Sequence, residues 1–307
     1  MARNAILVIG SANMDLVVST ERFPQPGETV FGKKFGMYPG GKGANQAVAA
    51  AKLGGNVYFL GKMGKDTFRE KLCASMQKDG VNLDHLLIDS EASTGMALIT
   101  LNGGGQNEII VVSGSNMSLS PADIESKRPI FAAARFVLLQ LEIPLETVTQ
   151  AARLAKEQGA IVILNPAPAC ELPPALLRLI DYLTPNETEA ELLIQQGVHD
   201  QNSAQAAATK LLAHGVKNVV LTMGDKGALL VNREKVELFP AKQVQAVDTT
   251  AAGDAFNGAL AFALANGKMV DEAIRFANTV AAYSVTKMGA QSSMPTLEQV
   301  SQIAGLA

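Results

Sequence analysis

Hydrophobic residues along the chain follow two spacings, and their alternation predicts its architecture. Short apolar runs typical of buried strands occur at residues 6–9, 57–60, 136–140, 161–164, 182–184 and 219–222. Apolar residues at helical spacing occur at 43–53, 67–78, 145–158, 187–196, 203–214 and 270–287, and in a segment that follows Gly253 and ends at Gly267. Strands that alternate with helices predict a mostly parallel sheet with helices on both faces, in a Rossmann-like α/β arrangement.

Two early stretches depart from this alternation. Residues 15–35 contain Pro24, Pro26 and Gly27, which indicates an excursion from the main sheet. Residues 94–101 and 108–112 flank an Asn-Gly-Gly-Gly turn, a strong hairpin signal, and a second hairpin is expected at 228–231 and 236–239. No long linker or repeat separates these parts. We therefore expect a single α/β domain, 1–307, with a β lid built from about 13–39 and 94–113.

Composition narrows the functional class. The chain has 307 residues, is 48% hydrophobic and carries a formal net charge of −3. This is no basic surplus for nucleic acid or an anionic membrane, so we expect neither partner. Two cysteines and three scattered histidines argue against a disulfide framework or a His-based metal site, and they fit a cytoplasmic location.

The most informative segment runs from Val247 to Gly258. It sets Ala251, Ala252, Gly253 and the carboxylate of Asp254 where a helix should begin. The first turn of a helix carries unpaired N–H groups, and small residues let an anion approach them closely. Asp254 beside such an anion can act as a base, which suggests phosphoryl transfer to a hydroxyl. The alternative is that Gly and Asp merely cap the helix.

A glycine-rich segment lies before the first predicted helix. It has the G-x4-G-K spacing of a P-loop, but Gly43 replaces the required Ser or Thr. Close backbone approach to a ligand remains possible there, and Asn45 can donate to and accept from a hydroxyl. A plain glycine turn is the alternative. The candidates for this segment are Gly40, Gly41, Lys42, Gly43 and Asn45.

Further polar residues follow predicted strands. Asn13 and Asp15 follow the first strand and Glu142 another, and in an open α/β sheet ligands bind at the carboxyl ends of strands. Asn186 and Glu189 are three apart at a helix start, which suits either hydrated Mg²⁺ or a capping box. The segment from Thr222 to Gly227 is either a nucleotide loop or a tight turn.

These segments together resemble the ribokinase family of carbohydrate kinases, the PfkB type. The resemblance covers essentially the whole chain and rests on four segments in order: 40–46, 186–189, 222–227 and 250–258. It implies a ribokinase-like fold and an ATP-dependent kinase that phosphorylates the 5-hydroxyl of D-ribose. It also implies Mg²⁺ with ATP, activation by K⁺, and a homodimer formed through the β lid.

The resemblance further implies a role for each candidate. Asp254 would be the base, and the backbone of Ala251, Ala252 and Gly253 would hold the γ-phosphate. Sugar-binding residues would be Asn13, Asp15, Gly40, Gly41, Lys42, Gly43, Asn45, Glu142 and Asp254. The ATP and Mg²⁺ region would use Asn186, Glu189, Thr222, Gly224, Gly227, Gly253 and Asn278. A monovalent-cation site would fall on Asp248, Thr250, Ser284, Lys287, Gly289 and Ser293, several of them through backbone carbonyls.

Alternative functions stay open at this point. A kinase of the same family could act on 2-deoxyribose, fructose or a nucleoside. A sugar or nucleotide sensor would bind without turnover, although it would not need the base. A nicotinamide oxidoreductase is disfavoured because the first strand lacks a following G-x-G-x-x-G.

Overall fold

An eight-stranded sheet forms the centre of the computed structural model, which describes residues 4–304. The strand order is β14-β13-β12-β11-β10-β9-β1-β4, with parallel pairing from β12 to β4 and an antiparallel hairpin at β13 and β14. The mostly parallel sheet and the terminal hairpin confirm the predicted fold class. The strands are β1 (Ala5–Ile9), β4 (Val57–Leu60), β9 (Ala134–Leu139), β10 (Ile161–Leu164), β11 (Tyr182–Leu183), β12 (Asn218–Thr222), β13 (Ala228–Asn232) and β14 (Val236–Phe239).

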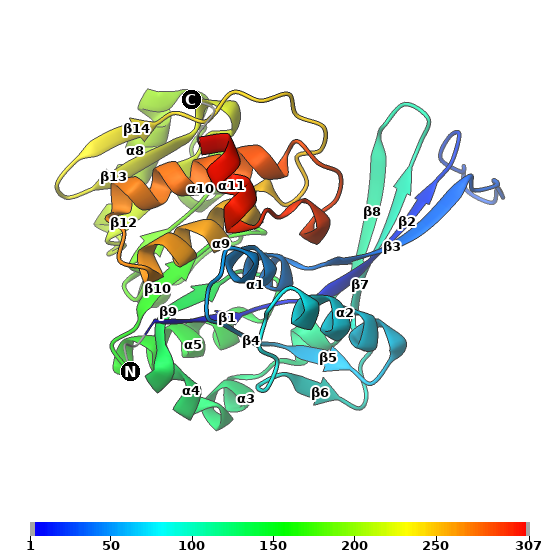
Figure 1. Cartoon of the computed structure of the whole chain (residues 1–307), viewed down its shortest axis with the longest axis horizontal. Coiled ribbons are helices and arrows are strands. Elements are labelled where there is room, and N and C mark those ends of the chain that lie inside the picture. The colour runs from blue at the N-terminus through cyan, green and yellow to red at the C-terminus, as the bar shows by residue number, and fades with distance from the viewer. Residues whose placement is uncertain (1–3, 305–307) are drawn as a thin grey trace.

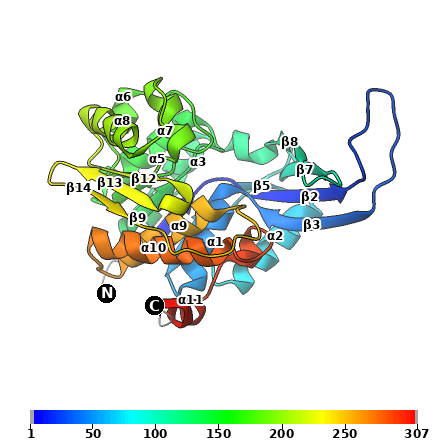
Figure 2. The same ribbon diagram turned by 90° about the horizontal axis from the view of Figure 1, so that it is seen from above.

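Helices cover both faces of this sheet (Figure 2). Two separate groups of buried side chains result, one on each face, because parallel strands bury their alternate side chains on both sides. One face carries α1 (Lys42–Lys52), α2 (Thr67–Lys78), α9 (Ala252–Ala265), α10 (Val270–Ser284) and α11 (Leu297–Ala304). The other carries α3 (Pro121–Ser126), α4 (Arg128–Ala133), α5 (Leu145–Glu157), α6 (Pro174–Leu177), α7 (Glu187–Ile194) and α8 (Gln201–Ala213).

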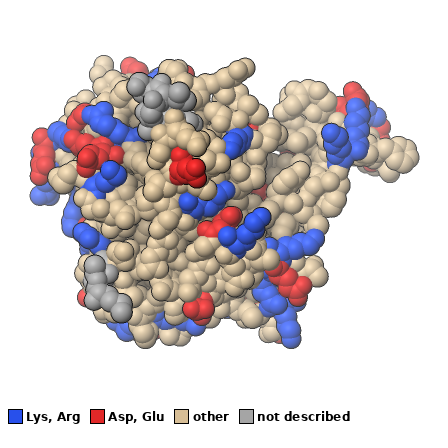
Figure 3. All heavy atoms as spheres, in the orientation of Figure 1, with Lys and Arg blue, Asp and Glu red and all other residues tan. Residues whose placement is uncertain are grey.

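A second, four-stranded sheet extends from one side of the body (Figure 1). Its order is β3-β2-β7-β8, with β2 (Asn13–Ser19), β3 (Lys34–Gly40), β7 (Gly95–Leu101) and β8 (Asn107–Val112). We call this sheet the lid. Strand β2 pairs in parallel with β7 and antiparallel with β3, and β7 and β8 form the expected hairpin. The lid face seen in Figure 3 is mostly uncharged, with charged side chains toward its outer end.

Some elements were not expected. Residues 36–40 of the glycine-rich segment belong to strand β3, and a small parallel sheet joins β5 (Lys62–Gly64) to β6 (Leu87–Asp89). The single-domain prediction for 1–307 includes residues 1–3 and 305–307, which lie outside the described residues. Between residues 4 and 304, no helix has the length and apolar character needed to cross a bilayer.

Candidate active site

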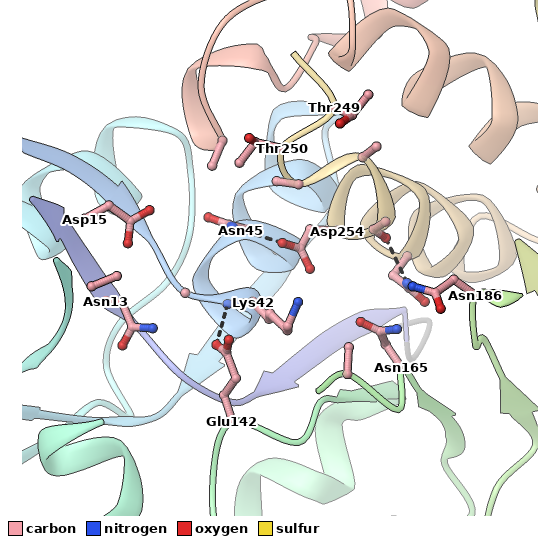
Figure 4. A pocket seen from close by; sticks show the side chains of 18 of the residues that line it. Asn13, Asp15, Lys42, Asn45, Glu142, Asn165, Asn186, Thr249, Thr250 and Asp254 are labelled. Atoms are coloured by element: carbon pink, nitrogen blue, oxygen red, sulfur yellow. Dashed lines mark hydrogen bonds between the residues drawn. The ribbon is translucent and has the colours of Figure 1, made fainter. Parts of the chain in front are cut away.

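A cavity of about 350 Å³ lies at the carboxyl ends of the parallel strands, beside the lid. Residues just past β9, β10 and β11 line it, together with the last residue of β12, the start of α9 and one face of the lid. Figure 4 shows Asn13 and Asp15 at one end, Asn186 at the other, and Asn45 and Asp254 between them. The cavity brings together Asn13, Asp15, Gly41, Lys42, Asn45, Glu142, Asn186, Glu189, Thr222, Thr250, Ala251, Ala252, Gly253 and Asp254.

Asp254 stands in the first turn of α9, and its carboxylate does not cap its own helix. The N-cap residue is Ala251, which makes no side-chain cap hydrogen bond. Instead, the two Asp254 oxygens accept hydrogen bonds from Asn45 Nδ2 and Gln46 Nε2, each at 2.9 Å. The capping alternative for Asp254 is therefore wrong. Burial raises the pKa of Asp254, while the charge of Lys42 and the two amides oppose the rise.

The backbone before Asp254 is strained and open. Ala251 has a φ of 58°, and the only other non-glycine residue with positive φ between residues 4 and 304 is Gln195. Such a strained backbone persists only where the surrounding structure holds it in place, and these positions cluster at active sites. A Cβ built on Gly253 meets no atom within 4 Å, so cavity space adjoins this residue. Within the described chain the Gly253 N–H has no partner, whereas the Ala252 N–H makes a long 3.3 Å bond to Thr249 O.

The end of the cavity with Asn13 and Asp15 presents acceptors and donors suited to hydroxyl groups. Burial, and then the neighbouring Glu142, raises the pKa of Asp15 to about 6. Glu142 accepts hydrogen bonds from Ser11 Oγ and from the Lys42 N–H. Asn45 Oδ1 is buried and has no partner among the described residues, which leaves an acceptor for a ligand.

Asn186 and Glu189 form the capping box that was one of the two alternatives considered for them, and they also line the cavity. Asn186 is the N-cap of α7 and forms a complete capping box with Glu189. The same two side chains line the cavity, and burial raises the pKa of Glu189. A capping role and a ligand role are compatible here because each oxygen keeps a free lone pair.

Several predicted site residues lie outside the cavity lining. Gly40 leaves room for the Asp15 carboxylate, since a Cβ there would come within 2.4 Å of Oδ2. A Cβ on Gly43 would lie 2.7 Å from the Gly10 backbone, where α1 packs on the turn after β1. Asn278 donates from Nδ2 to Phe239 O at 2.9 Å, which ties α10 to β14. Gly224 and Gly227 bound a short 3-10 turn after β12.

The six residues predicted for a monovalent cation lie in the loop before α9, at the end of α10 (Ser284), in the loop after α10, and in a short 3-10 turn (Ser293). Asp248 joins the two loops. Its carboxylate accepts from the N–H of Thr250 at 2.9 Å and of Gly289 at 2.8 Å. These bonds lower the pKa of Asp248, although partial burial opposes them. The hydroxyls of Ser284 and Ser293 donate to nearby backbone carbonyls. The Lys287 ammonium contacts the Tyr283 hydroxyl, and a cation cannot ligate a cation, so only the Lys287 carbonyl suits that role.

A set of cavity and near-cavity residues was not predicted from the sequence. The lid contributes an apolar face with Ala97, Ile99, Ile109 and Val111, and its alternate residues face away. The buried polar residues that were not predicted are Gln46, Gln140, Asn165, Thr184 and Asn257. Gln140, Asn165 and Thr184 each come directly after a strand, which was a usable signal.

Comparisons with known proteins find similarity over nearly the whole chain. The model of the pfkB family carbohydrate kinases matches residues 3–297. The chain is 44% identical to ribokinase of Haemophilus influenzae, over 97% of both chains, and 40% identical to deoxyribokinase of Salmonella typhi, over 98% of this chain and 99% of that one. The structure of Arabidopsis thaliana ribokinase complexed with ribose and ATP superimposes with a TM-score of 0.92 at 37% identity, covering 99% of each chain.

Proposed function

The chain belongs to the pfkB family of carbohydrate kinases, and on that premise we propose that it phosphorylates the 5-hydroxyl of D-ribose with ATP. The products are D-ribose 5-phosphate and ADP. The observation that carries the proposal is the position of Asp254, a buried carboxylate between a hydroxyl-binding end and an open helix start. Relatives named ribokinase support D-ribose as the acceptor.

In the proposed reaction, Asp254 accepts the proton of the sugar hydroxyl while that oxygen attacks the γ-phosphorus in line. The backbone at Ala251, Ala252 and Gly253 forms the anion hole, and it gains from the positive end of α9. Most of the rate enhancement comes from positioning and charge stabilisation, as in other phosphoryl transfers. Thr222, with the turn at Gly224 and Gly227 and with Asn278 behind it, belongs to the proposed ATP region.

The hydroxyl-binding end gives the sugar its proposed partners. Asp15 and Glu142 accept from sugar hydroxyls, and Asn13 donates, because its Oδ1 is already occupied by Asn116 Nδ2 at 2.7 Å. Asn45 accepts through its unpaired Oδ1. The Gly41–Lys42 backbone contacts the ring, while Gly40 leaves room for the Asp15 carboxylate and Gly43 lets α1 pack closely on the turn after β1.

Magnesium is the proposed divalent ion. No group of three or more His, Cys, Asp or Glu side chains in residues 4–304 is placed to hold a metal. The pair Asn186 and Glu189 fits Mg²⁺ that keeps its waters and is held mainly by nucleotide phosphates. When bound, Mg²⁺ neutralises the charge of the β- and γ-phosphates. Glu189 and Asn186 hold and orient each other through their capping box for that contact.

We propose K⁺ as an activator at the loops that Asp248 joins. These loops carry Thr250, one residue before strained Ala251, and Gly289, one residue before Ala290, which lines the cavity. An ion held by carbonyls of these loops, with Ser284, Lys287 and Ser293 contributing, steadies the start of α9. The low pKa of Asp248 keeps its negative charge available for this role.

We propose that the protein forms a homodimer through the lid, because the apolar strand β8 of the lid is exposed. All six residues of β8 are exposed, and it is an edge strand of the lid. An exposed apolar edge strand favours pairing with another chain. We treat body and lid as one domain. Free Cys73 and Cys170 accord with the cytoplasmic location that we also propose.

The deciding experiment measures ADP release from Mg-ATP with D-ribose, 2-deoxyribose, fructose and adenosine, each with and without K⁺. We expect the highest kcat/KM with D-ribose and a further rise with K⁺. Deoxyribokinase of Salmonella typhi favours 2-deoxyribose as the second candidate. A higher kcat/KM with 2-deoxyribose would replace the acceptor and keep the mechanism. ATP binding without turnover on any acceptor would favour a sensor.

A further inference from the structure

The side chains behind Asp254 form a connected amide network. Gln46 is fully buried on α1 and uses both of its amide protons, one to Asp254 Oδ1 at 2.9 Å and one to Asn165 Oδ1 at 3.1 Å. Its own oxygen accepts from Gln140 Nε2 at 2.6 Å. Asn165 in turn donates to Thr184 O at 3.2 Å. Three buried side chains, those of Gln46, Gln140 and Asn165, thereby lead to one carboxylate.

The network has a fixed direction. An ionised carboxylate only accepts hydrogen bonds, so the amide group of Gln46 must turn its NH₂ toward Asp254. Gln46 Oε1 then faces Gln140, which must donate. This arrangement leaves Gln140 Oε1 without a partner in the described chain. A buried oxygen left unpaired is costly, and its presence indicates that the direction of the network is set at Asp254.

The network is anchored to the sheet. Gln140, Asn165 and Thr184 directly follow β9, β10 and β11, and the last residues of these strands are paired in register. A fixed row of polar side chains therefore lies at the carboxyl ends of these three strands, between α1 and α9. Gly10 leaves space for this row, because a Cβ there would lie 2.0 Å from Gln140 Oε1.

The same row reaches the turn before Asp254. Thr184 Oγ1 donates to Asn257 Oδ1 at 2.6 Å, and Asn257 Nδ2 donates to Gly253 O at 2.8 Å. One end of the row thus fixes the carboxylate, and the other fixes the peptide group of Gly253. The distance between the proposed base and the proposed anion hole is set from the sheet rather than by α9 alone.

We propose that Gln46 is a positioning residue for Asp254, held by Gln140 and Asn165, and that this network orients the carboxylate toward the sugar hydroxyl. The network also favours the ionised form of a carboxylate whose burial opposes ionisation. The charged groups that face Asp254 are Lys42 on α1, Glu142 after β9 and Glu189 on α7. Substitutions within the network leave all three in place.

The test uses Gln46→Met, which keeps the length of the side chain and removes its donors. We expect the pKa of Asp254 to rise by about one to two units, because a hydrogen bond to a charged group is lost. The readout is the pH titration of ¹³Cγ-labelled aspartates by NMR, with the Asp254 signal assigned from its absence in Asp254→Asn. We also expect kcat to fall about 10- to 100-fold, the acid limb of the kcat profile to move to higher pH, and sugar KM to stay nearly constant.

Two further variants complete the test. Gln140→Met keeps the hydrogen bond from Gln46 to Asp254 and frees only Gln46 Oε1. It should therefore shift the pKa of Asp254 and the kcat profile in the same direction, but by less. If Gln46→Met does not fold, Gln140→Met provides the test by itself. Asn218→Leu is the matched control. Its amide also donates and accepts, at 3.0 and 3.1 Å, but at the amino end of β12. It should change neither the pKa of Asp254 nor the pH profile.

An unchanged pKa of Asp254 in both Met variants overturns the proposal, as does an equal change in Asn218→Leu. The kinetic readout rests on the proposed function, whereas the NMR titration does not. Absence of sugar phosphorylation by the wild-type protein would therefore reject the function and leave the titration to decide on the network.

Discussion

Asp254→Asn preserves the shape of the proposed base and removes its ability to accept a proton. We expect kcat with D-ribose to fall about 10²–10⁴-fold, the usual contribution of a general base. At 1.36 kcal/mol for each tenfold change, this is about 2.7–5.4 kcal/mol of barrier. The KM for D-ribose should change little, because Asn13, Asp15 and Glu142 hold the sugar independently of the proton transfer.

The structure also predicts how this variant changes stability. Both oxygens of Asp254 accept from amides, so an Asn places one NH₂ against another and loses one hydrogen bond to a charged group, worth about 1.5–3 kcal/mol. Against this, burial raises the pKa of folded Asp254 above its value of 3.8 in the unfolded chain. The wild-type protein therefore loses stability as pH rises from 3.8 through the higher folded pKa, and the loss persists above it. The difference in melting temperature between Asp254→Asn and the wild-type protein should therefore shift in favour of the variant as pH rises from 4 to 8.

Asp123→Asn is the matched control for a first-turn aspartate. Asp123 holds the same third position in α3 but forms a capping box with Ser120 and pairs with Lys62 at 3.1 Å. The Asp123→Asn variant should lose about 0.5–2 kcal/mol of stability and keep the turnover of the wild-type protein. Stopped assays of ADP release and thermal melts at both pH values test these outcomes. Near-normal kcat in Asp254→Asn would refute the assigned base.

Three further perturbations test other parts of the site. The KM for D-ribose should rise about tenfold per pH unit as pH falls below about 6, because protonated Asp15 no longer accepts from the sugar; Asp15→Asn should abolish this dependence in initial-rate assays. Gly258→Ala puts a Cβ 2.6 Å from Ala49 Cβ and should cost about 1–3 kcal/mol in urea denaturation, with lower kcat as α1 and α9 separate; unchanged unfolding would contradict this close packing. Asp248→Ala frees Gly289 from the neighbouring loop, so K⁺ should no longer raise turnover in a KCl titration, and retained activation would exclude the proposed cation loops.

The parts of the fold that sequence predicted best are those set by local pattern. Buried parallel strands such as β1 and β10 are short, continuous apolar runs, and their alternation with helices left one architecture. Strand β3 was expected only as part of the lid segment 13–39 and not as a separate strand, because it contains Gly36, Pro39 and Gly40, which disfavour a strand. It is an edge strand of the lid, where a proline removes no necessary ladder bond.

The candidate site divides in the same way. Asp254 and Asn13 could be found because each stands at the end of an element with a recognisable pattern. Gln46 could not, because its importance comes from Gln140 and Asn165, which lie 94 and 119 positions away in the chain. A polar residue inside the alanine-rich helix α1 was the one available signal. The lid residue Ile109 was missed for the opposite reason, since an apolar residue in a hairpin gives no indication of which face it lines.

The hydrogen bonds that orient Asp254 have a consequence for the time at which a newly made chain becomes active. Asn45 and Gln46 precede Asp254 by 209 and 208 positions. At translation rates of about 5–20 residues per second, roughly 10–40 s pass between synthesis of the two amides and synthesis of their acceptor. Helix α1 and the strand ends around it remain without α9 through that interval, so phosphoryl transfer at this site begins only after Asp254 has left the ribosome. A growing chain that ends before Asp254 therefore does not turn over ATP at this site.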